Sequence, residues 1–312
     1  MKIISFLTGL LAFGALLLKG TELDLKANSP WQKIGTGEFF VKYSGKGWPG
    51  LVAEIPSPTT NTFYKLSWEG KAEAGVPRTF VSIDYQQAKK DTLYIPWHPA
   101  TEYESCLQYF PAQMDAVAKR ISFSMNPGPG GNVFIRNASL APLLPAELEQ
   151  NLLPDGDFES GNTRPSNFSR VNAPPFEGIK IVQSPAFLSG CRSLELHPKA
   201  GENFAMESIF LPVIPGRKVK MIFWAKAERP AVLRGIINFS ARIHKGGKHL
   251  YASANFKLNE QWQQYSFRFD VPTDTAAYPA LLDKMAKLQY NLSPAEQENR
   301  IFLDNIEFRL EE

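Results

Sequence analysis

Cysteine is scarce in this chain, which has only Cys106 and Cys191 among its 312 residues. At most one bridge can form, and it would have to join the two halves of the chain, so a disulfide framework is excluded. Two thiols are also too few for a metal site built from thiolates. We expect both cysteines to be buried free thiols.

Histidine and the common catalytic motifs are equally sparse. The four histidines show no His-Glu-x-x-His spacing, and the chain has no Gly-x-Ser-x-Gly elbow and no phosphate-binding Gly-Lys-Ser/Thr loop. The glycine-rich "NPGPGGN" at 126–132 joins two strand patterns, which predicts a turn. We therefore expect no catalytic residues and no enzyme. A glycosidase pair of carboxylates, which meets only in three dimensions, stays open as an alternative.

The chain also has little net charge and no apolar run long enough to suggest a membrane span. The formal charge is +3, or +1 without Lys2 and Lys19, which gives no reason to expect nucleic acid as a partner. The apolar run Ile3–Leu18 follows Lys2 and is short for a membrane span. We predict a signal peptide over residues 1–20, with an uncleaved anchor as the alternative, and no later membrane span. The protein is then secreted or on the cell surface.

What the chain does contain is a repeated strand pattern. Its 24 prolines and 22 glycines suit many turns, and helical periodicity is weak. Apolar and polar residues alternate over 120–125, 265–271 and 287–292, which is typical of half-buried antiparallel strands. Short strands of this kind, separated by turn residues, predict an all-β sandwich or jelly roll.

Self-comparison indicates a duplication. The segments "LSWEGKAE" and "IFWAKAE" align Lys71 with Lys226, "ATEYESCLQYF" and "NEQWQQYSFRF" align Tyr103 with Trp262, and "GGNVFIRNASL" and "ENRIFLDNIEF" align Asn137 with Asn305. The offsets grow slowly, from 155 through 159 to 168 residues. We predict two domains, at 22–147 and 148–312, joined by the short linker "LLPAELEQ" with one helical turn.

The second copy resembles a known family through "NLLPDGDFESG", "SGCRSLEL", "LPVIPGRKVKMIFWAKAE", "QWQQYSFRF" and "IFLDNIEF", in this order. It is similar to the galactose-binding-like jelly rolls found as carbohydrate-binding modules of the cellulose-, xylan- and β-glucan-binding type. The resemblance implies two tandem antiparallel β-sandwich jelly rolls. Together with the predicted signal peptide and the missing catalytic motifs, it leads us to expect an exported, non-catalytic, monomeric protein that binds polysaccharide or oligosaccharide. The alternatives are a structural or adhesive cell-surface protein and, third, a jelly-roll polysaccharide lyase or hydrolase.

The resemblance also implies a structural calcium ion in the second domain. The positions that match the family's ligands are Asp157, through its backbone carbonyl, and the carboxylates of Glu159 and Asp304. Calcium takes six to eight oxygen ligands, which suits carboxylates and carbonyls brought together from two chain ends. In the first copy Arg136 falls where Asp304 does, and arginine only donates hydrogen bonds, so no calcium is expected there.

Aromatic residues are the candidates for a sugar site, because flat C–H faces of sugar rings pack on aromatic rings. The resemblance points to Phe204 and to His249 or Tyr251 in the second copy. The first copy has Trp48 in "GKGWPG" and Trp97 in "YIPWHPA", two tryptophans in loop sequences. For each, a ring that only packs against the sandwich is the alternative. Trp68, Trp224 and Trp262 lie in strand patterns, where we expect core residues.

Overall fold

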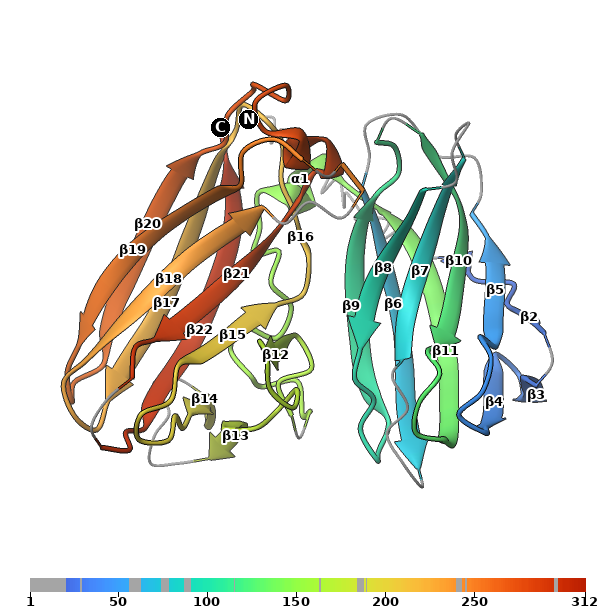
Figure 1. Ribbon diagram of the computed structural model, residues 1–312, viewed down its shortest axis with the longest axis horizontal. Coiled ribbons are helices and arrows are strands. Elements are labelled where there is room, and N and C mark those ends of the chain that lie inside the picture. The colour runs from blue at the N-terminus through green and yellow to red at the C-terminus, as the bar shows by residue number, and fades with distance from the viewer. Residues whose placement is uncertain are drawn as a thin grey trace, which may run out of the picture.

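A computed structural model describes most of the chain after residue 20. The described ranges are 21–28, 30–55, 63–73, 79–86, 91–114, 116–162, 164–183, 188, 190–239, 243–244, 246–294 and 297–312. The predicted signal peptide, residues 1–20, lies outside them. Over these ranges no helix has the length and apolar character needed to cross a bilayer. The chain forms two β-sandwiches that lie next to each other (Figure 1).

The first domain consists of two antiparallel sheets. Sheet A has the order β3-β4-β11-β6-β9, with β1 also paired to β11, and sheet B has the order β2-β5-β10-β7-β8. The bounds in sheet A are β1 Thr21–Glu22, β3 Gln32–Gly35, β4 Glu38–Tyr43, β6 Phe63–Glu73, β9 Glu104–Pro111 and β11 Gly131–Leu143. Those in sheet B are β2 Lys26–Ala27, β5 Gly50–Glu54, β7 Thr79–Gln86, β8 Asp91–Trp97 and β10 Val117–Met125.

The second domain follows the short helix α1 (Pro145–Leu148), which is the helical turn expected in the linker. Sheet C has the order β12-β15-β21-β18-β19, with β16 also paired to β21, and sheet D has the order β13-β14-β22-β17-β20. The bounds in sheet C are β12 Phe168–Arg170, β15 Phe204–Ser208, β16 Leu211–Pro212, β18 Ala231–Phe239, β19 Leu250–Leu258 and β21 Met285–Leu292. Those in sheet D are β13 Ile179–Gln183, β14 Arg192–Leu196, β17 Lys218–Ala227, β20 Gln263–Asp270 and β22 Ile301–Glu311, and a 3-10 helix, η1, spans Pro279–Asp283.

The strand order is the same in both domains, which confirms the predicted tandem arrangement. Sheet A corresponds to sheet D strand by strand, and sheet B corresponds to sheet C. The alternating segments lie where the sequence predicts strands. Ile121 and Phe123 of β10 and Leu288 and Tyr290 of β21 face inward and are buried. The chain is therefore an all-β protein of two tandem jelly rolls.

The duplication extends to an irregular backbone position. The register of β11 on β6 shifts between Arg136 and Ser139, and that of β22 on β17 shifts at the equivalent place. Asn137 and Asn305 lie at these two bulges with φ of 53° and 46°. Asparagine tolerates this left-handed conformation better than most side chains do. Both copies thus keep the same residue type at the same strained position.

A lysine held between two aromatic rings is also repeated. Lys71 Nζ lies 5.0 Å from the ring centroid of Tyr103 and 4.6 Å from that of Phe134. Lys226 Nζ lies 5.3 Å from the ring centroids of both Trp262 and Phe302. Cation–π contacts of this kind attach two neighbouring strands to the residue just before β9 in sheet A and just before β20 in sheet D.

Each sandwich has its own core, and a shared interface joins the two. Phe210 and Met285 of the second domain pack with the first core, while Phe63, Tyr109 and Leu143 of the first domain pack with the second. Strand β16 lies beside β9. Since these apolar side chains cross the boundary and Lys284 Nζ donates to the carbonyl oxygen of Gln113 at 3.1 Å, the two domains contact each other through more than the linker.

Three sequence expectations about burial need correction. Trp68 is a core residue, but Trp224 and Trp262 are only half-buried. The alternation in β17 explains Trp224, because Phe223 and Ala225 occupy the inward positions on either side of it. Both cysteines are free thiols, but Cys191 is exposed, since it lies in the turn before β14.

Candidate functional site

The outward face of sheet B carries a strip of three aromatic rings, Trp48, Phe80 and Tyr94, which we call the aromatic strip. Strand β7 alternates, so that Val81 and Ile83 enter the core and Phe80 faces outward. The Phe80 ring centroid lies 6.1 Å from that of Trp48 and 5.5 Å from that of Tyr94, both edge to face. Trp48 and Tyr94 are 64% and 55% exposed, so their rings are open to solvent.

Polar side chains lie on the same face as the aromatic strip. Arg120 Nε donates to Asp84 Oδ2 at 2.8 Å, and Thr92 Oγ1 donates to Asp84 Oδ1 at 2.7 Å. The hydroxyls of Ser122 and Ser124 lie 2.8 Å apart. Because Asp84 and Arg120 neutralise each other, the face offers hydrogen-bonding groups with little net charge. Such a mixture of flat rings and uncharged polar groups suits a hydroxyl-rich ligand.

The equivalent face of the second domain, on sheet C, combines one exposed ring with a row of amides. Tyr251 of β19 is 50% exposed, and its ring centroid lies 5.6 Å from that of His249. Asn238 Nδ2 donates to Gln289 Oε1 at 3.4 Å, and Gln289 Nε2 donates to Asn291 Oδ1 at 2.9 Å. We call Asn238, Gln289 and Asn291 the amide row.

His249 and Arg234 connect Tyr251 to its polar surroundings. His249 Nε2 and Asn238 Oδ1 are 3.1 Å apart, which joins the imidazole to the amide row. The Arg234 guanidinium lies 5.9 Å from the Tyr251 ring centroid and donates to Ser253 Oγ at 3.0 Å. Each amide has donor and acceptor atoms to spare beyond these bonds. The face can therefore both donate to and accept from ligand hydroxyls.

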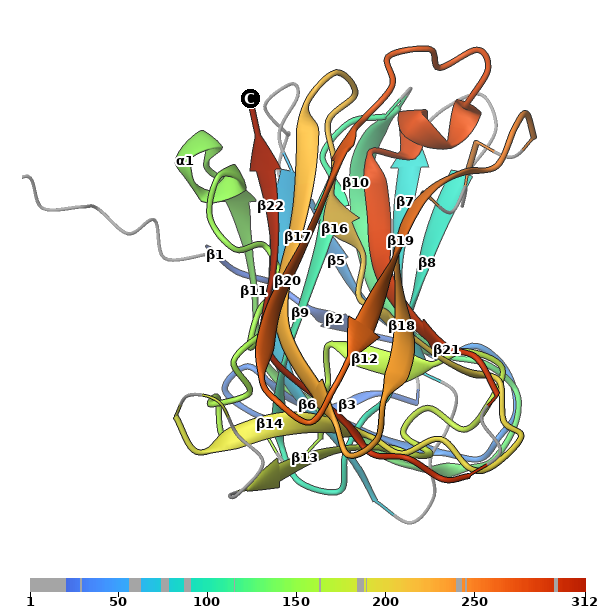
Figure 2. The same ribbon diagram turned by 90° about the vertical axis from the view of Figure 1, so that its left-hand side faces the viewer.

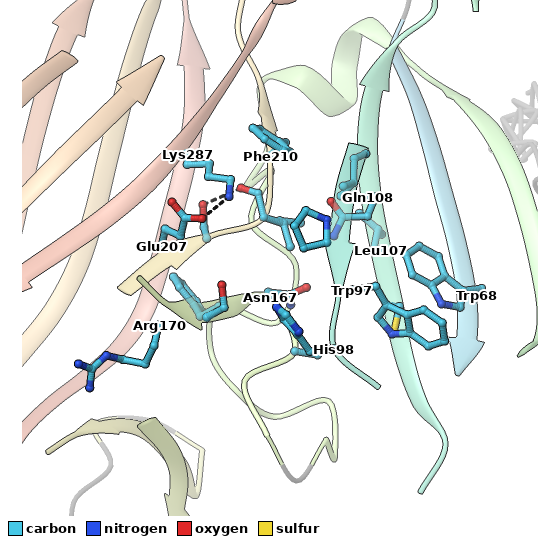
Figure 3. A pocket seen from close by; sticks show the side chains of 18 residues that line it. Trp68, Trp97, His98, Leu107, Gln108, Asn167, Arg170, Glu207, Phe210 and Lys287 are labelled. Atoms are coloured by element: carbon cyan, nitrogen blue, oxygen red, sulfur yellow. Dashed lines mark hydrogen bonds and ion pairs between the residues drawn. The ribbon is translucent and has the colours of Figure 1, made fainter. Parts of the chain in front are cut away.

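A cavity of about 230 Å³, here called the interdomain cleft, separates the two faces. Figure 3 shows Gln108 and Trp97 on the side of the first domain and Glu207 and Lys287 on the side of the second. Lys287 forms an ion pair with Glu207, and its side chain is 6% exposed. Since the charges are paired, the second-domain wall of the cleft is polar with little net charge.

His98 at the end of β8 also lines the cleft. Burial lowers the pKa of its imidazole to about 4, and the nearby cations Arg164 and Lys287 act in the same direction. The ring is therefore neutral at ordinary pH, with one nitrogen that donates and one that accepts. Arg164 Nη2 fixes the adjoining backbone by donating to the carbonyl oxygen of His98 at 3.1 Å.

The predicted sugar-contacting residues fall into two groups. Trp48, His249 and Tyr251 lie on the outward faces of sheets B and C, as described above. Phe204 is instead 1% exposed, with the Arg170 guanidinium 3.8 Å from its ring centroid. Trp97 is 6% exposed and packs edge to face on Trp68, at 5.7 Å between centroids. Phe204 therefore has no face open to a ligand, and Trp97 is accessible only where it borders the interdomain cleft.

Phe204 and Trp97 are buried for identifiable reasons. Phe204 occupies an inward position in β15, next to outward Ala205. The Trp97 ring lies directly over Gly70, where a Cβ atom would overlap the indole carbons. Gly70 thus makes room for a large side chain in the first core. The loop-like sequence around Trp97 gives no sign of this packing.

The predicted calcium residues bind backbone N–H groups. Glu159 Oε1 accepts from Cys191 N at 2.8 Å and from Arg192 N at 2.9 Å. Asp304 is fully buried, and its Oδ2 accepts from Leu188 N at 3.1 Å. Asp157 Oδ1 accepts from Glu159 N at 3.4 Å. Both Glu159 and Asp304 thus hold the chain just before β14.

A calcium ion at this place would have few carboxylate ligands. Among the described residues, no three His, Cys, Asp or Glu side chains gather in a way that holds a metal. The ion would therefore need several backbone carbonyl oxygens, which calcium accepts readily. The calcium site stays a prediction.

Several surface residues were not singled out from the sequence. Phe80 and Tyr94 complete the aromatic strip, and all three members of the amide row, Asn238, Gln289 and Asn291, were missed. One signal for the two aromatics exists: in "TFVSIDYQ" and "DTLYIPW" they occupy the polar positions of an alternating strand. An aromatic residue on the polar side of such a pattern points outward.

Comparisons with known proteins add structures of similar fold. No protein-family model and no curated protein matches the chain. Among solved structures, the N-terminal CBM22-1–CBM22-2 tandem domain of Xyn10C from Paenibacillus barcinonensis is similar with 15% identity and a TM-score of 0.38, covering 93% of this chain and 94% of that one. TmCBM61, solved with β-1,4-galactotriose, has 16% identity and a TM-score of 0.36, covering 52% of this chain and 99% of its own.

An enzyme structure is also among the similar ones. Arabinose-bound MgGH51 α-L-arabinofuranosidase has 14% identity and a TM-score of 0.40, covering 54% of this chain and 27% of that one. The fold of the present chain is established by its own strand order and register rather than by these likenesses.

Proposed function

We propose that this chain is an exported, non-catalytic protein that binds neutral polysaccharide or oligosaccharide through the outward faces of sheets B and C. One observation carries the proposal. In the part of the chain that the structure describes, the exposed aromatic side chains are Trp48, Tyr94 and Tyr251, and all three lie on these two equivalent faces. Exposed rings beside uncharged polar groups match the alternating C–H and hydroxyl surface of a sugar.

We infer a neutral glycan because two pairs of opposite charges lie on these faces and Arg234, which donates to Ser253 Oγ, adds one cation beside Tyr251. Asp84 with Arg120 and Glu207 with Lys287 each neutralise one another. An anionic polymer would require a surplus of cations on these faces, as in nucleic-acid-binding proteins. Export follows from the apolar N-terminal run, and the partner is then an extracellular or cell-surface glycan. The protein acts as a monomer with two binding faces.

A glycan array tests the proposal. The protein is applied to plant and bacterial polysaccharides, including neutral and acidic ones, and retention is scored at equal ionic strength. We expect retention on at least one neutral glycan with little dependence on salt. Retention on none of them, together with binding to proteins of the cell surface, would favour the adhesive alternative instead.

Catalysis is tested separately on the bound polysaccharide. The protein is incubated with it at high concentration, and new reducing ends and unsaturated products are measured over time. We expect neither product to accumulate above the buffer control. Their accumulation would show a hydrolase or a lyase and would contradict the non-catalytic part of the proposal.

A further inference from the structure

The outward faces of sheets B and C lie on the same side of the molecule. Figure 2 shows β7, β8 and β10 of sheet B on the same side as β18, β19 and β21 of sheet C, while β6, β11, β17 and β22 lie on the other. The edge of the first domain that faces the second carries β8 and β9, and residues of β8, β12, β15 and β21 meet in the interdomain cleft. The two faces are therefore neighbours across the cleft.

We propose that the aromatic strip, the interdomain cleft and the amide row form one continuous site that binds a single saccharide chain across both domains. This inference rests on the proposed carbohydrate-binding function and specifies its ligand as a chain long enough to cross the domain boundary. A pair of independent sites on two tethered modules would need no cleft between them.

The surface is continuous on the side of the first domain. Pro96 lines the cleft and is paired with Phe80 in the register of β8 on β7. Phe80 in turn contacts both Tyr94 and Trp48. A saccharide chain that leaves the cleft toward the first domain therefore reaches the aromatic strip directly.

The surface is also continuous on the side of the second domain. Glu207 lines the cleft and is paired with Gln289 in the register of β15 on β21. Gln289 belongs to the amide row, whose Asn238 is paired with Tyr251 across β18 and β19. Polar side chains thus follow one another from the cleft to the exposed Tyr251 ring.

The cleft itself has groups suited to a sugar hydroxyl. Gln108 is 6% exposed, and its Oε1 accepts no hydrogen bond from the described residues. A buried acceptor without a partner is costly, so a donor that enters the cleft gains from it. His98 is neutral and can donate or accept. The volume of about 230 Å³ is far above the ~10–15 Å³ that one water needs.

The dimensions require a polymer. Neighbouring strands in a sheet are ~4.8 Å apart, so the three strand steps from β5 to β8 and the four from β12 to β19 together span about 34 Å before the cleft is included. A mono- or disaccharide covers only part of this length. A longer chain gains because its second contact is intramolecular, and the affinity of linked contacts can exceed that of either one by ~10²–10⁴.

The test is a chain-length series of the glycan that the array identifies, titrated into the full protein by calorimetry. We expect short oligosaccharides to bind weakly and the long chain to bind with one chain per protein and at least ~10-fold higher affinity. Trp48→Ala and Tyr251→Ala should each weaken the long chain. In each variant, the affinity of the long chain should fall to that of a short one.

A cleft variant separates one continuous site from two separate ones. Gln108→Leu removes the amide whose Oε1 lacks a partner and puts an apolar side chain in its place, so the melting temperature should change little. We expect it to weaken the long chain by ~5-fold or more and to leave short oligosaccharides on the two faces unaffected. Ile34→Ala, which changes an exposed side chain on sheet A, is the control. It should alter neither the affinity for the long chain nor that for short oligosaccharides.

Two results would overturn the inference in different ways. Two long chains per protein, or equal affinity for long and short chains with no effect of Gln108→Leu, would show independent sites and leave the carbohydrate-binding function standing. Failure of every glycan to bind would remove both the function and the composite site.

Discussion

The ring of Trp48 meets that of Phe80 edge to face, with centroids 6.1 Å apart. Phe80 is 7% exposed and lies on a strand paired on both sides, so it is a rigid support for a ring that is otherwise 64% exposed. A ring that is already oriented loses little conformational entropy when a ligand covers it. This contact explains why a large aromatic side chain can remain at the surface in a defined position.

Replacing Trp48 with alanine should weaken glycan binding and leave the fold intact. The side chain is mostly exposed, so its removal costs the core little, while the ligand loses an aromatic surface worth ~1–2 kcal/mol, or roughly 5–30-fold in affinity. Affinity electrophoresis in a gel that contains the glycan measures the change. Ile34→Ala, with 50% exposure on sheet A, is the matched control. Equal retention of Trp48→Ala and the control would exclude Trp48 from the site.

Phe204→Ala should act on stability rather than on a sugar contact. The ring is buried in the second core and supports the Arg170 guanidinium at 3.8 Å. Loss of a buried phenylalanine costs ~3–5 kcal/mol because it leaves a cavity. Urea denaturation followed by circular dichroism measures this loss. A variant with wild-type stability and weakened glycan binding would show that the ring contacts the ligand after all.

Stability should fall as the pH drops below about 6.5, in part because of His98. Burial, helped by Arg164 and Lys287, lowers the pKa of this imidazole from 6.5 to about 4 in the folded protein. Between these values the unfolded chain binds a proton that the folded chain does not, so the free energy of unfolding rises with pH across this window. The contribution is at most ~3 kcal/mol.

Urea midpoints at pH 7 and pH 4.5, for the wild type and His98→Gln, measure that contribution. We expect the urea midpoint of His98→Gln to change less between pH 7 and pH 4.5 than that of the wild type. His197→Gln is the control, since the His197 side chain is 42% exposed. If the urea midpoint of His98→Gln changed with pH as much as that of the wild type, His98 would have an ordinary pKa in the folded state.

Calcium should raise the melting temperature of the second domain. Its proposed ligands, Asp157, Glu159 and Asp304, lie around the entry to β14, where a cation would hold the first and last parts of the domain together. Calorimetric melting with EDTA and with excess calcium tests this, and Asp304→Asn should remove the calcium response. Identical melting curves under both conditions would rule out a calcium ion in this domain.

The sequence predicts the fold well because the relevant signals are local or repeated. Alternation places Ile121 and Leu288 in the two cores, and the aligned Asn137 and Asn305 lie at equivalent bulges. The period-two pattern and the duplication depend on the chain alone. The alternation within each strand therefore already determines which side chains pack in the core.

The site is predicted less completely because exposure depends on distant residues. Trp48 and Trp97 both follow glycine- or proline-rich loop sequence, yet only Trp48 is exposed. The difference comes from Gly70, whose missing side chain leaves room for the Trp97 ring in the first core. Phe204 belongs to a strand whose inward side is decided by its partners in sheet C. The cleft is formed by residues from two domains, and no motif in one segment reveals it.

The most direct test of the central claim is the binding of a Trp48→Ala/Tyr251→Ala double variant. These substitutions remove one exposed ring from each of the two faces and touch neither core. Affinity electrophoresis on the identified glycan should show loss of retention, while the melting temperature stays within a few degrees of the wild type. Full retention by a folded double variant would contradict carbohydrate binding through the outward faces of sheets B and C.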